Sequence, residues 1–239
     1  MLSVKPSGSG GIRRERARAT RRRMLAAAFE LFAHQGYAPT TMGQIAAAAG
    51  VAVQTLHFTF HTKADLLKEV VTNYAAGEED PDPVMDRAWM REAMATPDGT
   101  HQLALHIEHG IDIYMRMAPL TPALQTAASI DAEVAALMAY HAAGRRAGMG
   151  AAIEALARKG WLREGLDLKR ATDLMVVLNS HETFLGLTQG AGWSVEDFKA
   201  WLYLTLCDQL LPYAPPTGRI AAAAGLSYHH QLTLLASPT

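Results

Sequence analysis

The residues of this chain whose types could do chemistry gather near its N-terminus. Seven arginines stand between Arg13 and Arg23, and Gln54, Thr55 and His57 follow on a short segment further along. Arginine side chains neutralise phosphate charge, and a glutamine amide can form two hydrogen bonds with adenine in the DNA major groove. These residue types and their order favour binding to a nucleic acid.

Short helices must position these side chains. The segment Arg22–Gln35 carries an apolar stripe at helical spacing, and a Thr41-x-x-Gln44 capping box predicts the start of a second helix. Gly50 supplies a tight turn before a third helix over Val53–Phe60. Two short helices joined by a glycine turn are typical of a helix-turn-helix, whose second helix enters the major groove.

We expect bases to be read from the third helix and phosphates to be held at two helix N-termini. Thr41 opens the second helix, and Lys63 lies at the start of a fourth, which a Thr62–Asp65 cap begins. The residues predicted to contact DNA are Thr41, Gln44, Val53, Gln54, Thr55, His57, Phe58 and Lys63.

Residues 24–68 carry a more specific combination of motifs. They include Leu31-Phe32, Gly36-Tyr37, Ile45-Ala46, Ala49-Gly50-Val51, Thr55-Leu56 and Leu66-Leu67. On these motifs the segment closely resembles the DNA-binding domain of TetR/AcrR-family transcriptional regulators. Ala52 departs from the family, which usually has Ser or Thr as the cap of the third helix. The resemblance implies a second helical domain that senses a small molecule and forms a homodimer on a palindromic operator.

Charge is divided unevenly along the chain. Residues 1–76 hold ten Lys and Arg against four Asp and Glu, whereas residues 77–239 hold twelve against nineteen. A basic front on an acidic body suits a DNA-binding end joined to another module. Cys207 is the single cysteine, so no intrachain disulfide is expected, and no apolar run approaches a membrane span. These features predict a cytoplasmic, nucleoid-associated protein with no membrane partner.

Abundant alanine and few β-branched runs predict an all-α fold of about nine helices. The expected domains are a disordered segment 1–12, a basic arm with helix-turn-helix 13–62, a helical ligand-binding and dimerisation domain 63–211, and a tail 212–239. The arginine block is either a solvated arm or helix extension, or an arm that contacts DNA. Long helices are expected over 84–96, 100–117, 131–159, 167–189 and 194–211.

The middle helices carry methionine and aromatic residues mixed with histidines. Such a lining favours a pocket for a flat, largely apolar effector, although each residue alone also fits an ordinary core. The candidate pocket residues are Trp89, Met94, His106, His109, Ile113, Met117, Tyr140, His141, Met175 and His181. The i,i+3 pair His106 and His109 has no motif to complete a metal site, so no metal and no cofactor are predicted.

The last two strong helices carry unusually apolar faces. They belong either to the core of one chain or to a dimer interface, where the family resemblance places a four-helix bundle. The candidate interface residues are Leu174, Leu178, Phe184, Leu185, Phe198, Trp201 and Leu202.

The predicted function is a ligand-responsive transcriptional regulator, a repressor released from its operator by a small, largely apolar molecule. Ligand binding would move the fourth helix and change the separation of the two recognition helices. Two alternatives stay open: an activator or constitutive DNA-binding dimer without ligand sensing, and an all-helical enzyme. Phosphate-binding loops, dinucleotide fingerprints and nucleophile elbows are absent from the sequence, so no enzymatic activity is expected.

Overall fold

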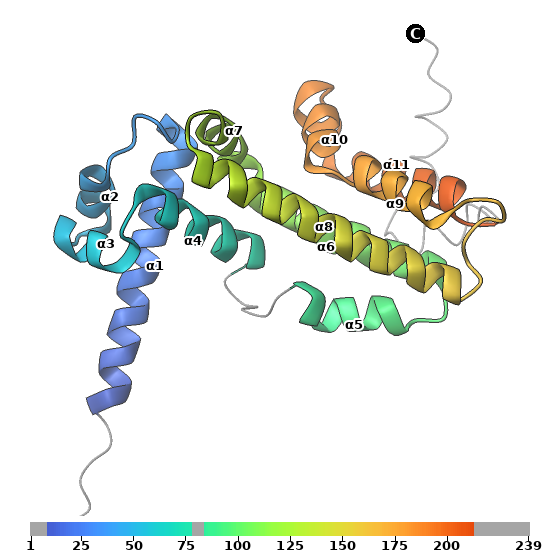
Figure 1. Cartoon of the computed structure of the whole chain (residues 1–239), viewed down its shortest axis with the longest axis horizontal. Coiled ribbons are helices and arrows are strands. Elements are labelled where there is room, and N and C mark those ends of the chain that lie inside the picture. The colour runs from blue at the N-terminus through green and yellow to red at the C-terminus, as the bar shows by residue number, and fades with distance from the viewer. Residues whose placement is uncertain (1–8, 78–83, 213–239) are drawn as a thin grey trace, which may run out of the picture. The chain divides into compact units, whose positions relative to one another are not determined.

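The computed structural model describes residues 9–77 and 84–212, and every regular element in these ranges is helical. The predicted all-α class is therefore confirmed. The helices are α1 (Ser9–Gln35), α2 (Met42–Ala49), α3 (Val53–Phe60), α4 (Lys63–Ala76), α5 (Ala88–Ala95), α6 (Gly99–Met117), α7 (Thr121–Ile130), α8 (Ala132–Arg158), α9 (Leu168–Leu178), α10 (His181–Leu185) and α11 (Val195–Leu210) (Figure 1). Short 3₁₀ turns cover Val84–Asp86 and Ala118–Leu120, and a π turn covers Gly186–Gly190.

The chain divides into two compact units. Of the described residues, the first unit holds 9–75 and 119–139, and the second holds 76–77, 84–118 and 140–212. The sequence placed the boundary between residues 62 and 63, whereas the structure groups α4, α7 and the start of α8 with the helix-turn-helix. The physical reason is burial, since Leu66, Leu67 and Val70 of α4 are completely buried.

The first unit forms around the apolar stripe of α1. Phe32 of α1, Ile45 of α2 and Leu56 of α3 are fully buried, and Figure 1 shows α2 and α3 beside α1. The turn predicted at Gly50 is confirmed, because Gly50 has φ of 66°, and Gly36 at the end of α1 has φ of 85°; a residue with a Cβ rarely adopts such values. These turns orient α2 and α3 as a helix-turn-helix.

Side-chain caps fix where α2 and α4 begin. Thr41 accepts a hydrogen bond from the Gln44 backbone N–H, and the Gln44 side chain accepts one from the Thr41 N–H in return. Thr62 and the backbone N–H of Asp65 are likewise joined at 2.9 Å. Both caps were expected from the sequence and are confirmed.

The N-terminal boundary and the 118–130 region differ from the expectation. Residues 9–12, expected to be disordered, are helical and continue into α1, because the arginine block itself takes up helix. No helix was expected between residues 118 and 130, yet α7 forms there, with Pro122 in its first turn, where proline is tolerated. Residues 1–8 of the segment predicted to be disordered, and residues 213–239 of the predicted tail, lie outside the described residues.

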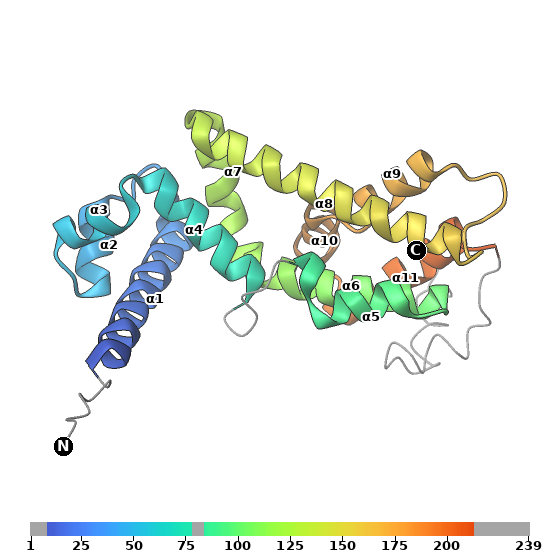
Figure 2. The same ribbon diagram turned by 60° about the horizontal axis from the view of Figure 1, so that its bottom comes forward.

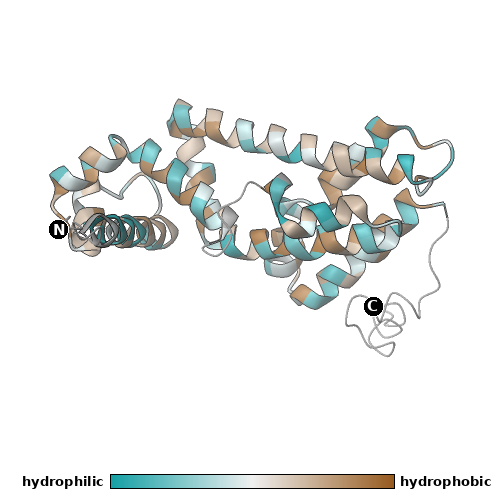
Figure 3. Cartoon of the chain, turned by 90° about the horizontal axis from the view of Figure 1, so that it is seen from below, coloured by the Kyte–Doolittle hydropathy of each residue, from teal (hydrophilic) through white to brown (hydrophobic). Residues whose placement is uncertain are grey.

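The second unit contains α5, α6, α9, α10, α11 and most of α8. Here α11 contacts both α6 and α9, and α5 lies along α6 (Figure 2). Each helix carries both hydrophobic and hydrophilic positions (Figure 3), and the hydrophobic ones build a shared core that includes Leu103, Ile111, Ile153, Phe198 and Leu206.

The long helix expected over residues 167–189 is broken in two. Asn179 leaves the helical region, with φ of −91° and ψ of 61°, and Ser180 then caps α10 by accepting a hydrogen bond from Thr183 N–H at 3.0 Å. The sequence pattern is apolar on both sides of this break, so hydrophobic periodicity alone did not reveal it.

Candidate functional site

Helix α3 presents one face to solvent and buries the other. Leu56 and Phe60 have exposed fractions of 0% and 2%, and they hold the helix on the first unit. Phe58 has an exposed fraction of 85%, which is unusual for a large apolar side chain unless a partner covers it. The five residues predicted on the recognition helix, Val53, Gln54, Thr55, His57 and Phe58, are all exposed.

The two ends of α3 are held differently from those of α2. At its start, Ala52 makes no side-chain cap hydrogen bond. At its end, the Nδ1 of His57 lies 3.1 Å from the backbone oxygen of His61. A carbonyl oxygen only accepts hydrogen bonds, so Nδ1 carries the proton and Nε2 of a neutral His57 is an acceptor.

Lys63 does not stand free for a phosphate, which corrects its predicted role. Its ammonium donates to the backbone oxygens of Tyr37 at 2.8 Å, Ala38 at 3.3 Å and Thr40 at 3.0 Å. It also lies 4.2 Å from the centre of the Tyr37 ring, and burial lowers the pKa of Lys63. An ammonium has three donors, so all of them serve to hold the α1–α2 loop.

Thr41 and Gln44 are both exposed at the start of α2, where contact with DNA was predicted. The Thr41 hydroxyl donates to the Gln44 side-chain oxygen at 3.1 Å, and the same oxygen accepts from the Thr41 backbone N–H at 2.8 Å. Because that oxygen is occupied by the cap, Gln44 can offer DNA its amide NH₂ group but not its oxygen.

The arginine block belongs to α1 and extends that helix toward its N-terminus. Arg13, Arg14, Arg16 and Arg18 are exposed along it. Arg21 is tied to the folded unit instead, through an ion pair with Glu69 at 2.9 Å and a position 4.7 Å above the Phe60 ring. The extension therefore presents fixed positive charge beside the helix-turn-helix.

Comparison with known proteins identifies this part of the chain. Residues 24–70 match the family described as "Bacterial regulatory proteins, tetR family". The HTH-type transcriptional regulator TtgW of Pseudomonas putida, itself uncharacterised, is 33% identical over 88 residues, which are 36% of this chain and 66% of TtgW. Residues 24–70 therefore form a DNA-binding domain of the tetR family of bacterial regulatory proteins, and the match to TtgW spans less than two thirds of that protein.

The fold of the chain as a whole is also that of solved structures. A transcriptional regulator from Saccharomonospora viridis in complex with choline superposes with a TM-score of 0.63 and 20% identity, over 80% of this chain and 97% of that one. FadR from Bacillus subtilis in complex with stearoyl-CoA has a TM-score of 0.64 and 18% identity, over 79% and 98%. At these identities the likeness establishes the fold.

Three of the residues predicted to line an effector pocket come together in the second unit. The Trp89 ring of α5 stacks on His109 of α6, with centroids 4.6 Å apart, and meets the edge of His106 at 5.8 Å. His106 is buried, whereas Trp89 and His109 are half-buried. Within the described ranges, no three His, Cys, Asp or Glu side chains are grouped closely enough to hold a metal ion.

The other predicted pocket residues are spread over the same unit. His181 meets Tyr114 edge to face at 5.4 Å, and Met175 is completely buried in the core. Met94 and Ile113 are half-buried and Met117 is buried. Tyr140 and His141 correct the prediction, because both lie exposed on α8 and Tyr140 has an exposed fraction of 74%.

The apolar residues predicted for a dimer interface divide into two groups. Phe184, Phe198 and Leu202 have exposed fractions of 4%, 0% and 0%, so they form the core of the single chain and have no surface to offer a partner. This corrects the prediction for those three. The remaining residues, Leu174, Leu178, Leu185 and Trp201, are half-buried.

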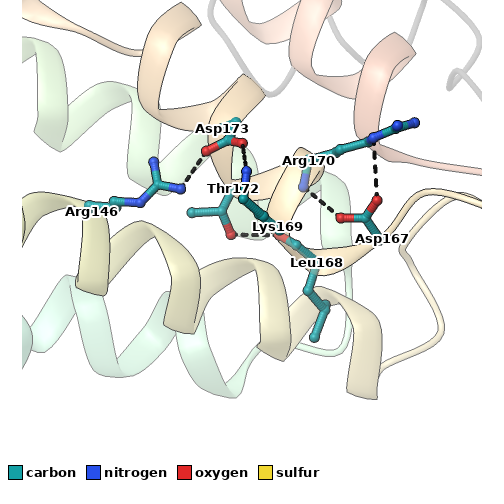
Figure 4. A network of polar contacts seen from close by, with 7 residues as sticks. All are labelled: Arg146, Asp167, Leu168, Lys169, Arg170, Thr172 and Asp173. Atoms are coloured by element: carbon teal, nitrogen blue, oxygen red, sulfur yellow. Dashed lines mark hydrogen bonds and ion pairs between the residues drawn. The ribbon is translucent and has the colours of Figure 1, made fainter.

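Exposed apolar surface on α9 centres instead on Val177, with an exposed fraction of 63%. One turn before it, Asp173 accepts hydrogen bonds from Arg146 of α8 and from Lys169 at 3.0 Å (Figure 4). The contact with Arg146 joins α9 to α8 at the surface, and the contact with Lys169 lies within α9, while Val177 stays uncovered within the protomer.

Sequence reasoning missed a set of polar residues around α6. Gln102 is fully buried, donates to the backbone oxygen of Ala152 at 2.8 Å and accepts from Lys159 at 2.8 Å. Asn179 is also buried, and its side chain faces Gly110 of α6. A glycine inside a helix can indicate that another segment packs closely against it. Gly110 was the only feature of the sequence that pointed to the approach of Asn179.

A polar contact missed in the first unit joins its two chain segments. The hydroxyl of Tyr37 donates to Asp131 at 2.9 Å, and a surface groove of about 490 Å³ lies beside this pair. Asp131 also caps α8 by accepting from the Glu133 backbone N–H at 3.0 Å. These residues are too far apart in the sequence for a local pattern to pair them.

Among the described residues, no helix is long and apolar enough to cross a membrane.

Proposed function

We propose that this TetR-family regulator is a homodimeric repressor that leaves a palindromic operator when a small, largely apolar molecule binds its second unit. On this proposal it acts in the cytoplasm, at the nucleoid. The observation that carries the proposal is the outward face of α3, where hydrogen-bonding side chains and Phe58 are exposed on a helix anchored by Leu56 and Phe60.

The exposed residues of α3 have the chemistry needed to read bases. The amide of Gln54 can pair two hydrogen bonds with adenine, and Val53 or the Thr55 methyl group can contact thymine. His57 offers its Nε2 as an acceptor, which fits the cytosine amino group. Because Lys63 is held internally, phosphate contacts are assigned to Thr41 and to the arginines of the α1 extension.

A dimer follows from the way helix-turn-helix proteins read DNA. Two recognition helices address half-sites one helical turn apart, about 34–36 Å, so a symmetric pair is required for a palindrome. We place the interface on α9 and its neighbours, around exposed Val177 with half-buried Leu174, Leu178 and Trp201. An exposed apolar cluster on a helix face is a typical protein–protein contact.

Ligand sensing is supported by the aromatic and histidine cluster of α5 and α6. The structurally similar regulators mentioned above hold choline and stearoyl-CoA, so the shared fold accommodates small molecules of different kinds. A ligand that binds one conformation better than another shifts the population toward it, and it weakens operator binding by the same coupling free energy.

Operator binding is tested with DNA from upstream of the regulator's own gene. We expect a footprint with two-fold symmetry, and Gln54→Ala should weaken binding and relax base preference at one position per half-site, by about 1–3 kcal/mol. Gln125→Ala, an exposed glutamine of α7, is the matched control. Unchanged affinity and base preference in Gln54→Ala would rule out this face of α3 as the one that reads bases.

Operator binding that no effector weakens would favour a constitutive regulator, and transcription that rises with binding would favour an activator.

A further inference from the structure

Two buried atoms beside α6 have no hydrogen-bond partner. Among residues 9–77 and 84–212, neither the Nε2 of His106 nor the Oδ1 of Asn179 reaches a donor, although His106 and Asn179 have exposed fractions of only 7% and 2%. Buried polar atoms are nearly always hydrogen-bonded, because leaving one unpaired carries the full penalty of its desolvation. The two atoms therefore call for partners from outside the chain.

The free nitrogen of His106 is an acceptor. Its Nδ1 lies 2.9 Å from the backbone oxygen of Gln102, and a carbonyl oxygen can only accept, so Nδ1 carries the proton. Burial lowers the pKa of His106, and the nearby charge of Lys159 lowers it further. The ring is thus neutral near neutral pH and offers a lone pair at Nε2.

Asn179 is held in place by its own backbone. Its carbonyl oxygen accepts from the Tyr114 hydroxyl at 2.6 Å and from Arg145 at 3.2 Å. Its Oδ1 lies 3.5 Å from the point where a Cβ on Gly110 would stand. His106, Gly110 and Tyr114 follow one another at spacings of four, so they share a face of α6. Both acceptors therefore lie along this face, roughly one helical turn apart.

The surrounding charges restrict what could serve these acceptors. Arg145 and Lys159 are cations close to Asn179 and to Gln102 respectively, so a ligand ammonium group is disfavoured. An anionic oxygen has no proton to donate, so it cannot satisfy either acceptor. A neutral donor is left, and the Trp89 indole, stacked on His109 and edge-on to His106, provides an aromatic surface beside it.

We propose that the effector is a neutral, flat molecule with a hydrogen-bond-donating hydroxyl, of which a phenol is the simplest example. Its hydroxyl donates to His106 Nε2, Asn179 Oδ1 accepts from a second donor or a bridging water, and its ring lies against Trp89. This assignment rests on the proposed function for placing the effector among these helices.

Paired probes that differ only in the donor test the assignment on the full-length protein. The pairs are 4-phenylphenol with 4-methoxybiphenyl, and 2-naphthol with 2-methoxynaphthalene, with dissociation constants measured by calorimetry at pH 7.5. We expect each phenol to bind roughly five- to tenfold more tightly than its methyl ether, the worth of about one hydrogen bond. His106→Phe keeps an aromatic ring and removes the acceptor, so it should abolish this preference. His101→Phe, at an exposed position of α6, should retain it.

Ethers that bind as tightly as their phenols would overturn the assignment, and so would failure of both pairs to bind. Because the comparison is made first on the unaltered chain, it stands even if His106→Phe does not fold. Operator affinity measured with the same compounds separates this assignment from the proposed function. If the phenols bind selectively but operator affinity does not change, the donor site at His106 is supported and release of the operator by the effector is refuted. If compounds without a hydrogen-bond donor release the operator, effector control of DNA binding is supported and the donor site at His106 is refuted.

Discussion

Single residues in this regulator are often engaged differently from what their type suggests. Lys63 has the chemistry of a phosphate ligand, but its three donors bind backbone oxygens of the α1–α2 loop. His106 could serve as a metal ligand by type, yet it is buried with one nitrogen donating and the other open. Neighbouring groups, rather than residue identity, decide which atoms are available to a partner.

The missing cap of α3 gives a prediction at this scale. Ala52 has the extended backbone of an N-cap, with φ of −69° and ψ of 144°, but no side chain that accepts a hydrogen bond. Ala52→Ser should therefore raise the free energy of unfolding by about 1 kcal/mol. Urea titration should show a higher midpoint with an unchanged slope. The control Ala48→Ser, on the exposed face of α2, should give no gain, and an equal gain there would refute the capping argument.

The buried His106 predicts a pH dependence of stability. Its pKa in the folded state is lowered below 6.5, mainly by burial, so the unfolded chain binds more protons as the pH falls below about 6.5. Stability contributed by this residue is present above that pH and is lost as the pH falls. Burial lowers the pKa of His181 as well, so part of the effect remains without His106.

This dependence is measured as the unfolding free energy at pH 7.5 and 5.5. The unaltered chain should lose stability on acidification, and His106→Phe should lose less. His101→Phe, at an exposed position, should behave as the unaltered chain. A steeper loss in His106→Phe than in the unaltered chain contradicts the assignment of a neutral buried ring.

At the scale of elements, helix ends and extensions carry most of the functional information. The helix α1 begins at Ser9, so the arginine block forms a regular helical surface continuous with the helix-turn-helix. In the second unit, Asn179 and Ser180 end α9 and begin α10 within a segment that the apolar pattern predicts as one continuous helix. The first feature adds charge beside α3, and the second brings Asn179 next to Gly110.

The α1 extension should bind phosphates without sequence preference. Arg13, Arg14 and Arg16 replaced together by Gln should weaken binding to operator and unrelated DNA alike. The slope of log affinity against log salt should flatten by about 0.9 for each phosphate that the variant no longer neutralises. The matched control, Arg91, Arg158 and Arg170 to Gln, removes the same charge from the second unit and should leave the slope unchanged. Equal slopes in the two variants would show that the extension does not touch DNA.

At the scale of the whole molecule, burial distinguishes the apolar residues that form the protomer core from those that are exposed to a partner. Phe198 and Leu202 are fully buried in the second unit, whereas Val177 has an exposed fraction of 63%. A charge at Leu202 is therefore expected to unfold the protomer, and its effect on assembly would carry no information about an interface.

Val177→Asp tests the dimer without disturbing the protomer core. We expect a shift from dimer to folded monomer in sedimentation equilibrium, together with loss of operator affinity, because a charge would be desolvated at the interface. Ile130→Asp is the matched control, since Ile130 on α7 has an exposed fraction of 62%. A Val177→Asp protein that stays dimeric would place the interface elsewhere.

The sequence by itself determined the all-α class, the helix-turn-helix and the caps at Thr41 and Thr62. These features depend on local spacing and on residues within four positions of one another, which a linear pattern contains. Only the tertiary structure decided that Lys63 binds the α1–α2 loop, that Leu202 lies in the protomer core and that Tyr140 is exposed on the surface of α8. It also brought Asn179 beside Gly110 and Tyr37 beside Asp131. Such pairings arise from packing between segments distant in the chain, and hydrophobic periodicity shows which face is buried but not against what.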